Sequence, residues 1–223
     1  MTIHEVTLTV ERLGDAASFY GDVLRLPVVM KDGQAQVTVG SSRLVLEPGE
    51  RFHGAHHLAF GIPPADFERA RAWLEERLTL VAAADGSVVI DGPAGWNSRS
   101  LYFLGPEDIL LELIARDADA AAPGNEGAVP RVLSISEVGI GVPDVAAAVR
   151  TLTQELSLPT FPPQGAGFAP VGDHDGLLIV VDEDRIWFPS YHQSAARGPL
   201  ALQLGAPHAA ALNLTPSTRI VAA

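Results

Sequence analysis

The sequence predicts an α+β protein in which paired βαβββ modules form a curved mixed sheet, followed by a partial third module. Three segments repeat one pattern, and each opens with the strand-like alternation of apolar and polar residues before it changes to helical spacing. In the first and third copies, 19 residues separate the opening glutamate (Glu5, Glu137) from a leucine of the closing motif (Leu24, Leu156), and the second copy is two residues longer. This common spacing indicates three copies of one structural unit.

The first module is expected over residues 1–52. Alternation in residues 5–10 predicts a strand with one buried face, and a short helix-like stretch then runs as far as Tyr20. The turn residues Asp32-Gly33 and the run at 40–42 divide the short strands that complete this module.

The second module is expected over residues 53–116. Residues 57–62 alternate as a strand, and Pro63-Pro64 ends it. The apolar residues that follow recur at spacings of three and four, which places them on one helical face: Phe67, Ala70, Trp73, Leu74 and Leu78. Turn signals at Asp85-Gly86 and Gly105-Pro106 separate the remaining short strands.

The rest of the chain is expected to hold a linker and an incomplete third copy. Residues 117–130 are rich in Ala, Asp, Gly and Pro, which predicts a flexible linker. Residues 131–223 are assigned to a partial third module and a C-terminal tail, with a strand at 137–142 and a Pro/Gly-rich stretch at 162–167. The pattern after Tyr191 predicts no specific element.

Composition excludes several classes of function. Lys plus Arg number 15 against 27 Asp plus Glu, and the net charge of −12 argues against a nucleic-acid or anionic-membrane partner. The absence of cysteine excludes disulfides, zinc-thiolate sites, iron–sulfur clusters and thiol nucleophiles. The sequence has neither a signal-peptide pattern nor an apolar run long enough for a membrane span, so we expect a cytoplasmic protein.

Strand parity places four ionisable side chains on the faces that no helix covers. In the first strand the covered set is apolar: Val6, Leu8 and Val10. Glu5 therefore faces the other way, as does His57 at the start of the second module. The last strands of these modules offer Glu47 and Glu112 opposite their buried leucines. If the first and second modules pair into one curved surface, the four side chains converge, and one imidazole with three carboxylates suits a divalent metal.

Other residues near these positions are weaker candidates. Thr7, Trp96 and Tyr102 could wall a substrate pocket, although single aromatic residues more often belong to a core. His4 and His56 have the parity of the covered face, so we expect them to be packing or surface residues.

Paired βαβββ units with ligand positions on their first and last strands resemble the vicinal-oxygen-chelate superfamily. This superfamily includes glyoxalase I, bleomycin-resistance proteins, fosfomycin-resistance enzymes and extradiol dioxygenases. Residues 17–27 are similar to its first-helix signature, and residues 57–60 and 102–113 resemble the opening and closing strands of its metal-bearing module. The resemblance covers residues 3–116 well and 132–181 more loosely.

The resemblance implies a metal-dependent enzyme acting on a small molecule chelated through adjacent oxygens. It places ligands for one divalent ion (Fe, Mn, Ni or Zn) at Glu5, Glu47, His57 and Glu112. Catalytic proton transfer then falls to Glu112 or Glu47. Because Fe(II) dioxygenases use two histidines and one carboxylate, the single open-face histidine favours a lyase or isomerase. Ring cleavage stays open, since the residues around Trp96 resemble members labelled as ring-cleaving dioxygenases.

The alternative is a binding or resistance protein without metal, whose acidic groove sequesters an aromatic or cationic compound. The third copy has Glu137 in the equivalent first slot, but its matching strand at 177–181 offers no carboxylate. We therefore expect no second metal site there. The third module is expected to cover the sheet or to form a homodimer contact.

Overall fold

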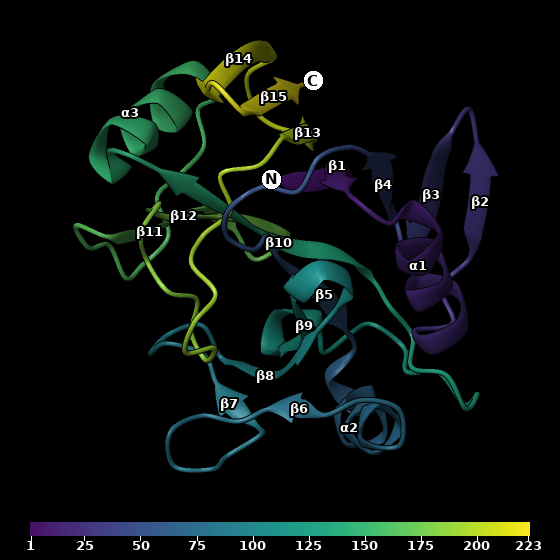
Figure 1. Cartoon of the computed structure of the whole chain (residues 1–223). Helices are drawn as coiled ribbons and strands as arrows, with labels where there is room; N and C mark the ends of the chain where they lie inside the picture. Colours follow the sequence, from purple (N-terminus) through teal and green to yellow (C-terminus); the bar gives the residue numbers. More distant parts are fainter.

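The computed structural model describes all of residues 1–223 and contains two mixed β-sheets with three α-helices packed around them (Figure 1). The α+β class predicted from the sequence is confirmed. The first sheet has the order β14-β15-β13-β1-β4-β3-β2. Its strands are β1 (Thr2–Val10), β2 (Val28–Lys31), β3 (Gln34–Val39), β4 (Ser42–Pro48), β13 (Leu200–Gly205), β14 (Ala210–Thr215) and β15 (Thr218–Ala222).

The second sheet has the order β11-β12-β10-β5-β9-β8-β6, with β7 paired to β8. Its strands are β5 (His57–Ile62), β6 (Leu80–Val81), β7 (Ile90–Asp91), β8 (Ser98–Leu104), β9 (Leu110–Arg116), β10 (Ser134–Val142), β11 (Phe168–Asp173) and β12 (Gly176–Asp182). In each repeat the first and last strands are parallel neighbours: β1 with β4, β5 with β9, and β10 with β12. This arrangement is the one that a repeated βαβββ unit requires.

Each α-helix lies where a repeat predicts it. They are α1 (Leu13–Ser18), which continues into a π-helical turn at Phe19–Val23, α2 (Phe67–Glu75) and α3 (Val145–Glu155). Four of the five apolar residues on the predicted face of α2 are buried within it: Phe67, Ala70, Trp73 and Leu74. The side chain of Asp144 caps α3 by accepting a hydrogen bond from the amide of Ala147 at 2.8 Å. None of the helices has the length and apolar character needed to cross a bilayer.

The modules do not pair as expected. β1 runs antiparallel to β13, and β5 runs antiparallel to β10, so the first module joins the C-terminal strands and the second joins the third. The expectation that the first two modules share one concave surface is therefore wrong. The cause lies in the chain after Tyr191, where alternating residues of β13 bury Leu200, Leu202 and Leu204 and pair along the edge of β1.

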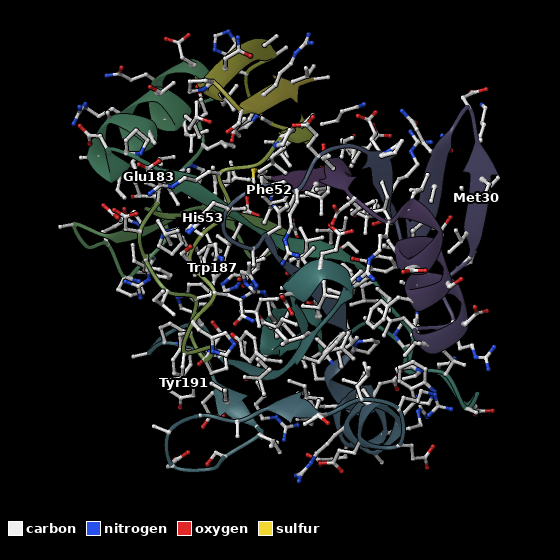
Figure 2. All side chains as sticks on the ribbon, in the orientation of Figure 1. Met30, Phe52, His53, Glu183, Trp187 and Tyr191 are labelled. Atoms are coloured by element: carbon white, nitrogen blue, oxygen red, sulfur yellow. The ribbon has the colours of Figure 1, made fainter.

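The core has two parts. One large cluster of 44 buried residues lies between the sheets and the helices. A second cluster of seven residues occupies the other face of the second sheet: Trp96, Leu110, Leu177, Ile179, Val181, Trp187 and Ala195. Residues 183–199, which connect β12 to β13, contribute to this cluster; we call them the covering segment. Figure 2 shows Trp187 and Tyr191 along this segment, with Met30 at the far edge of the first sheet.

Candidate metal centre

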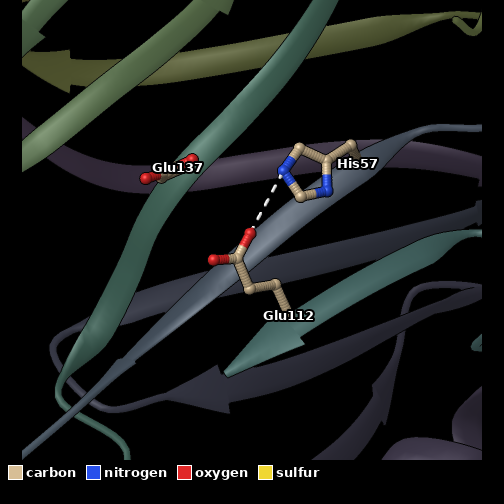
Figure 3. A group of neighbouring side chains, drawn as sticks. All are labelled: His57, Glu112 and Glu137. Carbon is tan, nitrogen blue, oxygen red and sulfur yellow. Dashed lines mark ion pairs between the residues drawn. The ribbon is translucent and has the colours of Figure 1, made fainter. Parts of the chain in front are cut away.

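Three ionisable side chains meet on the second sheet beneath the covering segment. They are His57 of β5, Glu112 of β9 and Glu137 of β10, and one potential ligand atom from each lies within 4.8 Å of the others. All three are buried, with 5%, 1% and 3% of their surfaces exposed, respectively. Figure 3 shows that they come from three neighbouring strands and point toward a common space.

The strand register brings these side chains together. Ala59 of β5 is paired with Glu112 on its parallel neighbour and with Glu137 on its antiparallel neighbour. His57 lies two residues before Ala59, so its side chain projects from the same face. Because Ala59 has only a methyl side chain, the space between the two carboxylates is left free.

His57 is held in one orientation and one tautomer. Its Nδ1 lies 3.2 Å from the carbonyl oxygen of Leu110, and because a carbonyl only accepts, Nδ1 is the nitrogen that donates. Nε2 then carries the lone pair and lies 3.5 Å from Oε2 of Glu112. Burial lowers the pKa of His57, despite the opposing charge of Glu137. A neutral imidazole with its second nitrogen hydrogen-bonded to the backbone has the form in which histidine binds metals.

Glu112 has an oxygen without a partner. Its Oε2 is buried and accepts no hydrogen bond. Burial raises the pKa of Glu112, opposed by Ser100, Arg116 and Tyr102. An ionised carboxylate oxygen in this state costs several kcal/mol unless a cation or donor satisfies it. The orphaned oxygen, together with the imidazole and the second carboxylate, therefore fits a divalent ion of the harder or borderline kind.

Glu137 already has one cationic partner, Arg116. The guanidinium forms a buried ion pair with Glu137 through Nη2 and donates from Nε to Oγ of Ser136 at 3.3 Å, while Nη1 has no partner. Burial and the neighbouring charge of Glu112 raise the pKa of Glu137 to about 7, opposed by Arg116 and His57. One arginine thus serves two carboxylates, so the centre carries an excess of negative charge whenever both are ionised.

Aromatic side chains enclose the centre. The indole of Trp187 lies 5.2 Å from the ring of His57, and the phenol of Tyr102 stacks against the same imidazole at 6.3 Å, both measured between ring centroids. Trp96 is buried in the same cluster. Gly139 of β10 permits the approach of Trp187, because a Cβ at this position would lie 2.5 Å from the indole. These contacts keep bulk water away from the three ionisable groups.

The structure does not bring Glu5 and Glu47 to this centre. Both lie on the first sheet, on β1 and β4, and neither belongs to the cluster of potential ligands. Glu5 pairs with Arg43 at 2.6 Å and accepts a hydrogen bond from Gln203 at 2.7 Å, and Glu47 accepts one from Gln34 at 2.6 Å. The predicted four-residue set therefore separates into two pairs, because its convergence depended on the first and second modules forming one surface.

The remaining candidates divide in the same way. Thr7 lies on β1 of the first sheet, whereas Trp96 and Tyr102 line the centre on the second. Glu137, whose slot was not expected to form part of a metal site, joins His57 and Glu112. The sequence contains a sign of this role, because Glu137 stands at the first strand position of the third copy, where Glu5 stands in the first copy. It was missed because the pairing of the second module with the third was not foreseen.

Comparisons with known proteins agree with this architecture. No protein-family model matches the sequence, and a search of curated proteins found no match. Among solved structures, a provisionally assigned dioxygenase from Bacillus subtilis is similar over 100% of this chain and 85% of its own, with a TM-score of 0.66 and 12% identity. A point mutant of glyoxalase I from Zea mays is similar over 91% of this chain and 74% of its own, with a TM-score of 0.57 and 14% identity. At these identities the likeness establishes the fold, and the predicted resemblance is confirmed at that level.

Proposed function

We propose that this chain is a metal-dependent enzyme of the vicinal-oxygen-chelate superfamily, in which His57, Glu112 and Glu137 hold one divalent ion. The observation that carries the proposal is the buried, unpartnered Oε2 of Glu112 beside the free Nε2 of His57. Burying these two acceptor atoms side by side costs free energy unless a cation or a proton lies between them. Glu137 takes the place that Glu5 and Glu47 held in the sequence prediction.

A bound divalent ion supplies Lewis-acid polarisation of two adjacent oxygens on a small substrate. Glu137 is suited to move the proton, because it is a carboxylate of the centre whose pKa burial and the charge of Glu112 raise in the metal-free protein. Arg116 positions this carboxylate through the ion pair. Trp96 and Trp187 exclude water from the reacting groups.

A lyase or isomerase fits these residues better than a ring-cleaving dioxygenase. Non-haem Fe(II) oxygenases hold iron with two histidines and one carboxylate, whereas this centre offers one histidine and two carboxylates. The neighbouring His56 does not supply the second imidazole, because it is not part of the ligand cluster. The substrate class that follows is a small molecule that loses or transfers a proton next to an oxygen.

Metal titration of matched variants tests the proposal. The protein, stripped of metal and titrated with Mn²⁺, Ni²⁺ and Zn²⁺, should bind one equivalent of at least one of them. Glu112→Gln should weaken that binding by about a hundredfold or more, and His57→Ala should abolish it, because each leaves an incomplete shell. Glu47→Gln removes the same charge from the first sheet and should leave the affinity unchanged.

Two outcomes contradict a metal centre. One is less than about 0.1 equivalent of every metal after reconstitution, since a folded site of this kind should load to completion. The other is equal affinity in the Glu112→Gln and Glu47→Gln proteins.

A metal-free binding protein is the second candidate, and the ion pair between Arg116 and Glu137 favours it. This pair neutralises one carboxylate without any metal. The aromatic walls at Trp96 and Trp187 would then contact an aromatic or cationic ligand directly. Saturable quenching of tryptophan fluorescence by benzyltrimethylammonium in protein that binds no metal would support this candidate over the first.

A further inference from the structure

A second cavity lies apart from the metal centre, where the first and second modules meet. It has a volume of about 330 Å³, and none of the three candidate metal ligands lines it. Its walls come from the end of β1, from α1, from the connection 51–56, from the turn 106–109, and from residues 192–194 of the covering segment. Figure 2 shows Phe52 and His53 of this connection, away from the outer edge of the first sheet at Met30.

One wall of this cavity holds a buried polar atom without a partner. His56 lines the cavity and is only 5% exposed, and its Nε2 makes no hydrogen bond to any protein group. The ring of Phe52 packs against the imidazole edge to face, with 5.0 Å between ring centroids. A buried nitrogen in this state costs about 1–3 kcal/mol, and a ligand that satisfies it recovers part of that free energy. Because Nε2 is closed to solvent, the ligand reaches it when a neighbouring side chain such as Phe52 moves aside.

The other walls determine the polarity of the ligand. The buried part of the lining includes the apolar residues Leu8, Val10, Leu46 and Ile109, together with the polar side chains of Tyr20 and Gln193. The charged residues lie toward the rim, where Glu107 is occupied because it accepts hydrogen bonds from the amides of Glu11 at 3.1 Å and Arg12 at 2.8 Å. The remaining charges, Arg51 and Asp108, have opposite signs, so Glu107 leaves the rim with a net charge of −1. This charge disfavours an anionic ligand, and no charged side chain lies in the interior to hold a buried ion.

We propose that this cavity binds a small uncharged molecule with an apolar body and one hydroxyl or amide group, which hydrogen-bonds to Nε2 of His56. A hydroxyl or amide group can both donate and accept, so it matches either tautomer of the imidazole. The volume lies at the lower end of the range for ligand pockets, which corresponds to a molecule with one ring. The covering segment contacts both sites, since Trp187 lies over the metal centre and Ser194 lines the cavity.

Three probes of nearly equal size test this assignment. Benzyl alcohol carries the hydroxyl, toluene lacks it, and benzoate carries a charge. In titrations followed by NMR, with the imidazole signals of His56 as reporter, benzyl alcohol should bind about tenfold more tightly than toluene, the worth of one recovered buried hydrogen bond. Benzoate should not bind, because its carboxylate would meet a rim of net negative charge and an interior without a cation.

Two variants test whether His56 causes the preference for benzyl alcohol over toluene. His56→Phe keeps the ring and removes the nitrogen, so the ratio of the two affinities should fall to about one. His53→Phe is the matched control, because His53 also lines the cavity but is exposed and lies 3.5 Å from Oγ of Ser194. It should keep the tenfold preference. If His56→Phe does not fold, the wild-type comparison of benzyl alcohol with toluene decides the question.

The proposal for the cavity and the proposal for the metal centre can be refuted independently of each other. The probe titrations need no metal, and the metal affinity of the His53→Phe protein should equal that of the wild type. Absence of saturable binding of benzyl alcohol, equal binding of benzyl alcohol and toluene, or an unchanged preference in folded His56→Phe would each overturn the assignment. None of these results affects the proposal for His57, Glu112 and Glu137.

Discussion

The two sheets carry glutamates at strand positions of the same parity, yet their environments differ. On the first sheet, Glu5 and Glu47 are partly exposed, and each has a side-chain partner within 2.7 Å. On the second sheet, Glu112 and Glu137 are buried, and one carboxylate oxygen of Glu112 has no partner. Parity therefore decides which face a carboxylate lies on, whereas the layer above that face decides whether the carboxylate needs a cation.

The layer differs because the covering segment crosses only the second sheet. Trp187 and Ala195 of this segment complete a buried cluster there, and they displace the water that would otherwise solvate the acids. The strand position from which a fourth ligand could project into the centre is also apolar. Gly139 is paired with Ile179 on β12, just as Ala59 is paired with Glu112 on β9, so an isoleucine stands where a fourth ligand would project.

Breaking the arginine pair on each sheet should produce the largest difference in stability. Arg116→Met leaves Glu137 buried without a counter-charge, which should lower the free energy of unfolding of the metal-free protein by about 3–5 kcal/mol. Arg43→Met removes the pair with Glu5, where the arginine side chain is 54% exposed, and should cost about 1 kcal/mol or less. Urea unfolding of both variants measures the two values.

A bound metal should reverse part of the loss in Arg116→Met, because the ion replaces the missing positive charge. Equal destabilisation by the two substitutions would contradict the view that burial separates the sheets. This outcome would also argue against the excess of negative charge on which the proposed metal centre depends.

The stability of the metal-free protein should depend on pH through Glu137. Its pKa rises from 4.5 to about 7 on folding, so the folded state holds a proton that the unfolded state has lost. This contribution is complete below pH 4.5 and is lost as the pH rises through 7, by roughly 3 kcal/mol at most. His56 acts in the opposite direction, since burial lowers its pKa to about 4, and stability is lost as the pH falls from 6.5 through 4.

Because the contributions of Glu137 and His56 to the pH dependence of stability partly cancel, the test compares the wild type with a variant that lacks one of these groups. Urea midpoints of the wild type and of Glu137→Gln, taken at about pH 5 and pH 8, should show that the substitution removes the loss on the alkaline side. Glu5→Gln serves as the control on the first sheet and should keep the wild-type profile. If Glu137→Gln also keeps that profile, Glu137 does not titrate in this range.

Much of the fold could be predicted from the sequence, because alternation and helical spacing are local properties. They locate the strand–helix repeats, and parity alone places His57 and Glu112 on one face. Pairing between modules could not be predicted in this way. It depends on which strand, far away in the sequence, pairs with β1 and which pairs with β5. The strand that pairs with β1 begins at Leu200, in a region where the sequence pattern predicts no element. For this reason Glu137 was missed and Glu5 was included.

Two glycines provide the smallest and most local test of the covering layer. Gly139 on β10 and Gly61 on β5 both lie in strands of the second sheet, but a Cβ at Gly139 would lie 2.5 Å from the indole of Trp187, whereas one at Gly61 would have no contact closer than 3.6 Å. The Cβ added at Gly139 would also lie 2.9 Å from the Cβ of His57, so Gly139→Ala must displace Trp187, His57 or both, at a cost of about 1–3 kcal/mol in the free energy of unfolding. Gly61→Ala should change it by about 0.5 kcal/mol or less.

The position of Trp187 can be followed by acrylamide quenching of its fluorescence, with Trp187→Phe used to assign its share of the signal. Gly139→Ala should raise the quenching of this residue, because the indole no longer lies over His57. Gly61→Ala should leave the quenching unchanged. If the two variants quench alike, the indole does not control access, and the dry environment of the acids must come from the remainder of the buried cluster. If only Gly139→Ala gains access, one side chain of the covering segment accounts for much of the difference between the two sheets.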